Sequence, residues 1–494
     1  MLRKLTLAAS VAAISLLGAT PVMAERTDII LGVALEPTHL DPTAGAAASI
    51  DEIVYANIFE GLTRIDQNGA VQPALAKNWT ISDDGLVYVF TLNSGVKFHD
   101  GTSFEAGDVA FSINRAMADD STNAQKALFE PIASVEAVDA TTVKITLKRP
   151  TGSLLFNLGW GDAVIVAPES ADNNKTSPVG TGPFVFSKWI KGDSVQILRN
   201  DAYWGTPVKL EKATFKIISD ATAAFASLMA GDVDAFANFG SPENIPQLQA
   251  DPRFTVSIGS TEGETILSTN NKKPPFDNLK VRQALAHAIN RQSIIDGAMF
   301  GQGTPIGTHF APHHAAYLDL TDKYPYNPAR AKELLAEAGY PDGFKATIKL
   351  PPPSYARRGG EIIASDLRKV GIDLEIIPVE WGPWIKDVFK AKDYDLTIVS
   401  HTEPMDIGIY ARDDYYFQYS NQAFKDVIKK LAAEANPAKR TALMQQAQTI
   451  ISDDAVNGFL FQLAKTGVWN SKIKGMWANA PVQANDLTGV YWEN

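Results

Sequence analysis

The sequence contains no cysteine among its 494 residues. This absence excludes disulfide bonds, thiolate metal sites, iron–sulfur clusters and a cysteine nucleophile. It also excludes a lipid anchor on an N-terminal cysteine. Any binding chemistry must therefore come from carboxylates, imidazoles, amides, aromatic rings and the backbone.

A run long enough to span a membrane is also lacking, because the longest apolar stretch covers only residues 5–17 and a spanning helix needs roughly 20 residues. Two basic residues, Arg3 and Lys4, precede this stretch, and small residues occupy the −3 and −1 positions of a cleavage site after Ala24. The pattern predicts a cleavable signal peptide over residues 1–24. We therefore expect an exported, periplasmic protein without a lipid tether.

Positive charge is in deficit. The chain has 45 basic against 56 acidic residues, a net charge of −11. Such a protein is poorly suited to neutralising phosphates, so nucleic acid and anionic lipid are improbable partners. The remaining composition, 45% apolar and 20% charged, is that of a globular protein large enough for two or three domains.

Sequence signatures of catalysis are missing as well. No P-loop and no Gly-x-Ser-x-Gly nucleophile motif occurs, and the glycines of 301–307 lack the spacing of a dinucleotide-binding turn. His309, His313 and His314 cluster in a proline-containing loop without the helical spacing of zinc motifs. We expect a surface or interface role for these histidines, no metal site, no cofactor and no enzymatic activity.

Periodicity and turn residues indicate where helices and strands lie. Residues 83–85 form a hairpin turn, Asn327 caps a helix that Gly339 ends, and helix and strand alternate in the second half, which predicts α/β layers with parallel strands. Further helices are expected at 105–117, 222–229, 361–370 and 437–451. Strands are expected at 29–34, 135–147, 208–218, 372–377, 393–400 and 458–463. The loops 176–183 and 270–277 are candidate domain crossings.

One loop concentrates polar and aromatic side chains. It follows the strand that ends at Ser400, begins with His401, Thr402 and Glu403, and continues to Asp406. Ligands in open α/β sheets bind beyond the carboxyl ends of strands. These residues are therefore candidates for a binding site.

Long stretches of the chain resemble the family 5 extracellular solute-binding proteins, the peptide, dipeptide and nickel receptors of ABC importers. The hallmark text is residues 77–101 followed by 104–109. Further matches follow in the family's order at 36–42, 59–62, 179–184, 199–204, 275–284 and 327–340. The resemblance spans nearly the whole mature chain.

The resemblance implies an α/β, two-lobed periplasmic binding protein fold with discontinuous lobes and an extra hairpin-rich subdomain, of the class C type. Lobe I would comprise residues 25–62, 180–270 and 468–494. The extra subdomain would be 63–179, inserted in lobe I, and lobe II would be 271–467. Ligand would lie between the lobes, which close about a hinge.

The resemblance also implies where ligand binds. The family holds a ligand amine on an Asp just after a Gly-Trp pair; here His401 stands at the Trp position and the available acids are Glu403 and Asp406. His401, with Thr402 beside it, would stack on the ligand or donate a hydrogen bond to it. The opposite wall would present the small residues Ala46, Ala47 and Ala48.

We therefore expect a monomeric periplasmic receptor that captures a short peptide or another amine-bearing solute and delivers it to an ABC permease. A receptor of the same fold for an opine, a sugar conjugate or a metal chelate is the nearest alternative. A secreted hydrolase would need paired acids at a fixed separation on rigid elements, whereas Glu403 and Asp406 share a loop. The signal peptide disfavours a DNA-binding regulator.

Overall fold

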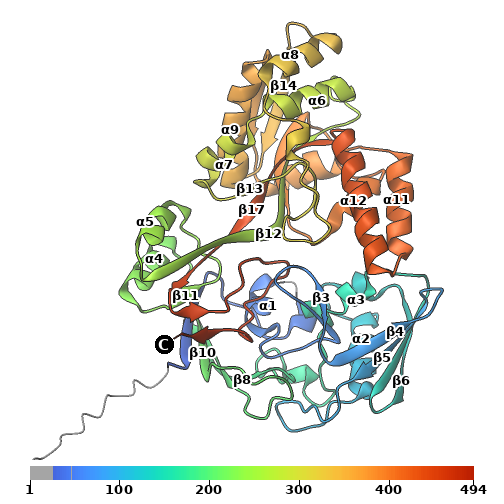
Figure 1. Ribbon diagram of the computed structural model, residues 1–494, viewed down its shortest axis with the longest axis vertical. Coiled ribbons are helices and arrows are strands. Elements are labelled where there is room, and N and C mark those ends of the chain that lie inside the picture. Colours follow the sequence, from blue (N-terminus) through green and yellow to red (C-terminus); the bar gives the residue numbers. More distant parts are fainter. Residues whose placement is uncertain (1–25, 46, 494) are drawn as a thin grey trace, which may run out of the picture.

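The computed structural model describes residues 26–45 and 47–493. The predicted signal peptide, the predicted mature start at Glu25 and Ala46 lie outside these ranges. Figure 1 shows a lower and an upper body, with strands β12 (Phe254–Thr269) and β17 (Asn457–Asn470) running between them. Within the described ranges, no helix is both long and apolar enough to cross a membrane.

The lower body is built around one end of the large sheet, in the strand order β11-β1-β10-β9-β8. The predicted strand at 29–34 is confirmed as β1, which pairs in parallel with β10 and β11. Buried residues from both ends of the chain, such as Leu31 and Trp492, share one core. The strands are β1 (Asp28–Val33), β8 (Phe184–Ile190), β9 (Ser194–Arg199), β10 (Lys212–Ile217), β11 (Ala235–Phe236), β18 (Ile473–Lys474) and β19 (Tyr491–Trp492). The helices are α1 (Ala48–Val54), α4 (Ala221–Ala230) and α5 (Ile245–Ala250).

A second sheet of the lower body has the order β4-β5-β7-β6 and is antiparallel throughout. The predicted hairpin is confirmed, with Gly85 in the left-handed region at φ 69°. Glu105 begins the predicted helix through a capping box with Asp108. The elements are β2 (Thr63–Ile65), β3 (Val71–Pro73), β4 (Ala76–Ile81), β5 (Val87–Leu92), β6 (Ile132–Asp139), β7 (Thr142–Leu147), α2 (Ala106–Met117) and α3 (Leu154–Asn157).

A buried carboxylate joins distant stretches of the lower body. Glu60 accepts hydrogen bonds from the Thr181 hydroxyl at 2.8 Å, the Tyr203 hydroxyl at 2.7 Å and the Trp204 indole N–H at 2.9 Å. Glu60 and its partners belong to three of the segments that carry the family resemblance, 59–62, 179–184 and 199–204. The matched motifs therefore include a structural hub.

The upper body continues the large sheet in the order β15-β14-β16-β12-β17. The predicted parallel pairing is confirmed for β14 with β15 and β16, but β12 pairs antiparallel with β16 and β17. The sheet is therefore mixed. Its strands are β13 (Thr304–Pro305), β14 (Phe344–Leu350), β15 (Ile372–Pro378) and β16 (Leu396–His401), besides β12 and β17. Its helices are α6 (Leu279–Ala288), α7 (Arg291–Met299), α8 (Pro328–Glu337), α9 (Ser354–Arg368), α10 (Trp381–Pro383), α11 (Gln422–Ala433) and α12 (Pro437–Asp453).

Helix α9 begins seven residues before the predicted start at Glu361. Gly359 and Gly360 weaken the helical signal there, yet both are buried in the helix. A Cβ on Gly360 would lie 2.4 Å from Leu350 Cδ1, so close packing on β14 requires glycine at this position. Tertiary packing has overridden helix propensity.

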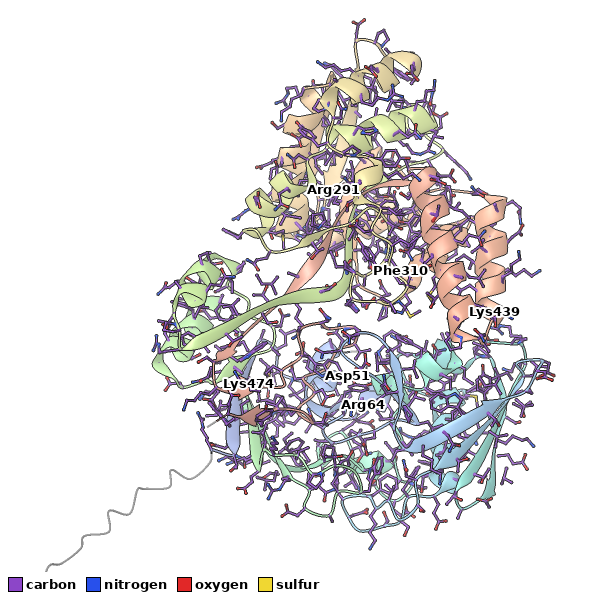
Figure 2. All side chains as sticks on the ribbon, in the orientation of Figure 1. Asp51, Arg64, Arg291, Phe310, Lys439 and Lys474 are labelled. Atoms are coloured by element: carbon purple, nitrogen blue, oxygen red, sulfur yellow. The ribbon has the colours of Figure 1, made fainter. Side chains whose placement is uncertain are left out.

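Separate hydrophobic cores occupy the two bodies, and one of these cores lies within residues 62–167. They agree with the proposed boundaries at 62/63 and 179/180, whereas Leu267 packs in the upper-body core before the proposed boundary at 270/271. These boundaries and the one at 467/468 stay a proposal. Away from β12 and β17, the bodies touch where the Gly152 N–H donates to the Ala432 carbonyl at 2.8 Å. Figure 2 shows this side of the molecule near Lys439, at the start of α12.

Candidate functional site

A cavity of about 500 Å³ lies where β12 and β17 pass between the two bodies. Both bodies contribute to its walls. The lining side chains that argue for binding are Glu52 on α1, Trp160, Asn238, Glu262 on β12, Thr402 with Glu403 after β16, and Lys465 on β17. Residues 480–485 complete the wall.

An irregularity in β12 shapes this cavity. The register of β12 against β17 shifts between Ser260 and Glu264, and the intervening Thr261, Glu262 and Gly263 line the cavity. Such a bulge aims side chains away from the regular pleat. The Glu262 carboxylate lies 2.7 Å from His313 Nε2 there.

The structure separates the predicted site residues. Thr402, Glu403 and Ala48 line the cavity, whereas His401 and Asp406 do not. Ala47 packs against the core of the lower body, and Ala46 lies outside the described residues. A binding role for these residues stays a prediction.

His401 and Asp406 instead belong to a buried cluster behind the cavity wall. His309 Nε2 lies 2.6 Å from one carboxylate oxygen of Asp406, and His401 Nδ1 lies 3.4 Å from the other. Burial would raise the pKa of the Asp406 carboxyl, but the two imidazoles hold it below its ordinary value. His309 is only 1% exposed, so the expected surface position of this histidine is wrong.

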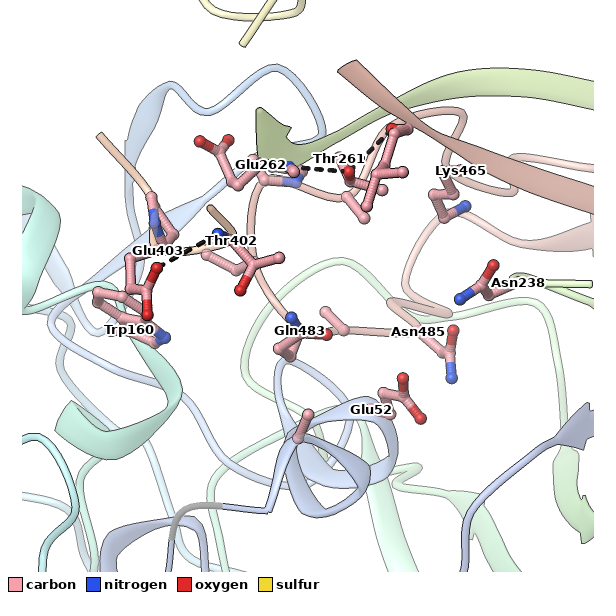
Figure 3. A pocket seen from close by; sticks show the side chains of 18 of the residues that line it. Glu52, Trp160, Asn238, Thr261, Glu262, Thr402, Glu403, Lys465, Gln483 and Asn485 are labelled. Atoms are coloured by element: carbon pink, nitrogen blue, oxygen red, sulfur yellow. Dashed lines mark hydrogen bonds between the residues drawn. The ribbon is translucent and has the colours of Figure 1, made fainter. Parts of the chain in front are cut away.

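Sequence reasoning missed Lys465, whose side chain points into the cavity from β17 (Figure 3). The residue is 4% exposed, and its ammonium donates to the Trp477 carbonyl. No carboxylate of the described residues lies within 4.0 Å of it. Burial lowers the pKa of Lys465 to about 8. The one feature of the sequence that could have marked Lys465 is its position as a lysine within the largely apolar stretch 458–469.

Glu52 was also missed, since nothing in the sequence of α1 marks it. Burial raises the pKa of its carboxyl above the ordinary range. Figure 3 shows Glu403 and Trp160 on one side of the cavity and Lys465 with Asn238 on the other. The lining therefore places the Glu403 carboxyl at one side and the Lys465 amine at the other, with Glu52 and Glu262 as further acidic side chains.

Comparisons with known proteins agree with this architecture. The family model described as "Bacterial extracellular solute-binding proteins, family 5 Middle" matches residues 70–426. Heme-binding protein A of Haemophilus influenzae is 31% identical over 428 residues, 78% of each chain. The glutathione-binding protein GsiB of Escherichia coli K12 is 30% identical over 450 residues, 86% of each chain.

Solved structures share the whole fold. HbpA2 from Haemophilus parasuis superposes with a TM-score of 0.87 at 27% identity, covering 94% of this chain and 100% of that one. The expected two-lobed α/β fold is confirmed. The chain belongs to family 5 of the bacterial extracellular solute-binding proteins.

Proposed function

We propose that this solute-binding protein captures a short peptide, or another solute with a free amine and a carboxylate, in the cavity between its lobes. The proposal rests on two side chains of opposite charge at opposite sides of the cavity, Glu403 and Lys465. A zwitterion placed between them pairs both of its charges. Burying a charge without a partner is costly, so this lining selects ligands of that kind.

The amine end belongs at Glu403 in this proposal. The Glu403 carboxylate already accepts a hydrogen bond from the backbone N–H of Thr402 at 3.2 Å, which orients it. Trp160 lines the same side, and an aromatic face attracts an ammonium group. Ala48 lets a ligand approach the opposite backbone closely. Asp406 and His401 position the loop rather than touch the ligand.

The lobes would close about the β12–β17 crossing and deliver the ligand to an ABC permease in the inner membrane, with no chemistry of the protein's own. We further propose a periplasmic monomer, exported by the signal peptide at 1–24. The family description as extracellular solute-binding proteins supports export. Relatives named for glutathione and a DppA from Helicobacter pylori in complex with the peptide STSA support a peptide ligand.

Calorimetry with a panel of ligands tests the proposal. The panel comprises glutathione, di-, tri- and tetrapeptides, their N-acetylated and C-terminally amidated forms, and heme, since one relative is named for heme binding. Native mass spectrometry of freshly purified protein adds any ligand carried from the cell. We expect free peptides to bind and doubly blocked ones to fail. Binding of heme alone would overturn the peptide assignment.

Ligand binding should close the lobes and stabilise the fold. A peptide at about 100 times its dissociation constant adds roughly 2.7 kcal/mol to the free energy of unfolding when it binds only the native state. The radius of gyration measured by solution scattering should fall at the same time. A tight ligand that left the scattering curve unchanged would contradict closure.

Glu403→Gln should weaken binding of the best free peptide by about tenfold or more. The Glu403 side chain is exposed in this structure, but lobe closure would remove its ion pair with the ligand from solvent. Ion pairs shielded from solvent contribute more than the roughly 1 kcal/mol of an exposed pair. Calorimetry with the N-acetylated peptide is the control, because that ligand should bind the variant and the parent equally.

Glu333→Gln on the exposed surface of α8 is a matched variant that should bind like the parent protein. An equal loss of affinity for the free and the acetylated peptide in Glu403→Gln would mean that Glu403 shapes the loop instead of holding the amine. Unchanged binding of the free peptide would remove Glu403 from the site.

A further inference from the structure

Three side chains with metal-binding atoms converge behind the cavity wall, and a fourth, Glu264, lies next to them on a separate strand. His401 ends β16, Asp406 lies in the following loop, His309 lies in the loop after β13, and Glu264 lies on β12. One ligand atom from each of His309, His401 and Asp406 lies within 4.8 Å of the others. The His309 and His401 rings are almost fully buried.

Glu264 is the second, independent sign of a cation. The residue is 3% exposed, its Oε2 atom has no hydrogen-bond partner, and it lines a small cavity together with His309 and Asp406. It stands directly opposite His401 in the β12–β16 register, so the two side chains leave neighbouring backbone positions. No lysine or arginine of the described residues lies within 4.0 Å of it. Burying a carboxylate in its charged form is costly without a cation beside it.

In each of the two histidines, the ring nitrogen that faces away from Asp406 already has a hydrogen-bond partner. His309 Nδ1 lies 3.2 Å from the Tyr410 hydroxyl, and His401 Nε2 lies 3.0 Å from the Tyr416 hydroxyl. Tyr410 is itself fixed by the Asn457 amide, which donates to its hydroxyl at 3.0 Å. Metal-binding histidines characteristically use their second nitrogen in this way, since the contact fixes the tautomer and the ring orientation. The other ring nitrogen of each histidine faces the Asp406 carboxylate, at 2.6 Å from His309 and 3.4 Å from His401.

We propose that His309, His401, Asp406 and Glu264 bind one divalent transition-metal ion, with Zn²⁺ as the best match. Two imidazoles and two carboxylates form a nitrogen and oxygen donor set of the kind zinc accepts in four-coordinate sites, whereas calcium and magnesium prefer oxygen alone. Two neutral imidazoles and two carboxylates also balance the charge of a divalent cation. Three of these donors already lie close together, and the Glu264 carboxylate would have to turn towards them to fill the fourth position; a site closed in this way is structural.

The ion ties the segment 401–406 to β12. Thr402, Glu403 and Pro404, which line the ligand cavity, lie between two of its ligands. The cation therefore holds the wall of the cavity from behind. Of the three histidines clustered in the sequence, only His309 takes part, because His313 pairs with Glu262 and His314 packs edge-on against Phe310.

Metal analysis of the tag-free, full mature protein tests this inference. After dialysis against a chelator, the protein is titrated with ZnCl₂ in competition with a chromogenic chelator. The zinc bound per chain is measured by inductively coupled plasma mass spectrometry. We expect one Zn²⁺ per chain and a rise in the melting temperature. Co²⁺ in place of zinc should give the intense visible absorption of tetrahedral coordination. Absence of stoichiometric zinc, or a Co²⁺ spectrum of hexaaqua type, would overturn the proposal.

Variants separate the site from chance binding. Asp406→Asn and the isosteric Glu264→Gln should each weaken zinc by about 100-fold, and Tyr410→Phe by about 10-fold or more through the outer contact. His313→Gln and His314→Gln are matched controls that should bind like the parent. Loss of zinc in these controls with retention in Asp406→Asn and Glu264→Gln would refute the assignment.

Circular dichroism of each metal-free variant tests whether it is folded. If Asp406→Asn does not fold, the isosteric Glu264→Gln variant provides the test of zinc binding. The titration contains zinc and no peptide. This inference does not rest on the proposed function, and its failure would leave the peptide experiments untouched.

Discussion

Lys465→Met should weaken binding of a free peptide by about 100-fold or more while leaving affinity for the amidated peptide nearly unchanged. The Lys465 ammonium is buried, and no carboxylate of the described residues lies within 4.0 Å of it, so a ligand carboxylate would be its partner. Removing one member of a buried pair typically costs about 3 to 5 kcal/mol, because the other charge is left without solvent or partner. Calorimetry with the peptide and its C-terminal amide on both proteins isolates this one interaction.

The pH dependence provides a second measurement. In the free protein burial lowers the pKa of Lys465 to about 8. A bound carboxylate favours the ammonium form and raises that pKa in the complex, so binding above pH 8 must take up a proton. The affinity ratio of free to amidated peptide should therefore be constant below about pH 8 and fall as the pH rises further. The ratio cancels titration of the peptide's own amine.

Lys465→Arg and the stability of Lys465→Met complete the test. Arginine keeps the charge and should retain much of the discrimination, while methionine should not lower the melting temperature of the ligand-free protein, because it removes a buried charge that has no counterion. Equal weakening of both peptide forms by Lys465→Met would show that the residue shapes the cavity. No weakening of either would remove it from the site.

Glu60→Ala should destabilise the fold by about 4 kcal/mol or more. One buried donor, from Thr181, and two partly buried donors, from Tyr203 and Trp204, would lose their acceptor, and each unsatisfied buried donor costs about 1 to 3 kcal/mol. Urea unfolding followed by circular dichroism measures the loss. Glu60→Gln keeps one acceptor oxygen and should lose less.

Ligand affinity of any folded Glu60 variant should be unchanged, since Glu60 does not line the cavity. A loss of stability below about 1 kcal/mol in Glu60→Ala would mean that water replaces the carboxylate. The three donors would then be solvated in the native state and the hub would be weak.

Local signals correctly predicted those helices and turns whose ends are marked by a capping side chain or a left-handed glycine. Helix α8 begins and ends as expected, because the Asn327 side chain accepts from the Arg330 N–H and Gly339 adopts φ 92° after the last turn. The turn at Gly85 and the helix stop at Gly231 are correct for the same reason. Caps and left-handed glycines act within a few residues, so a short stretch of sequence specifies them.

Strand β12 carried no such signal and was missed. Apart from the exposed Ile258, its central residues 257–263 are polar or glycine, so neither alternation nor a buried run marks them. The strand exists because β16 and β17 supply hydrogen bonds on its two sides. Pairing between segments about 200 residues apart cannot be read from either segment alone.

The candidate site divides in the same way. Thr402 and Glu403, in the loop after Ser400, line the cavity, and their binding role stays a prediction. Sequence could not distinguish Glu403, which faces the cavity, from Asp406 three residues later, which turns to His309 and His401.

The resemblance carried by matched segments along the chain was sufficient for the family, the two-lobed fold and the expectation of a binding protein. Periodicity and caps placed individual helices and strands. The charge of the cavity was accessible only in three dimensions. Glu52, Glu262, Glu403 and Lys465 come from four distant segments, and the crossing of β12 and β17 brings them to one space. Burial, and with it the strength of every charge in the site, depends on those long-range contacts.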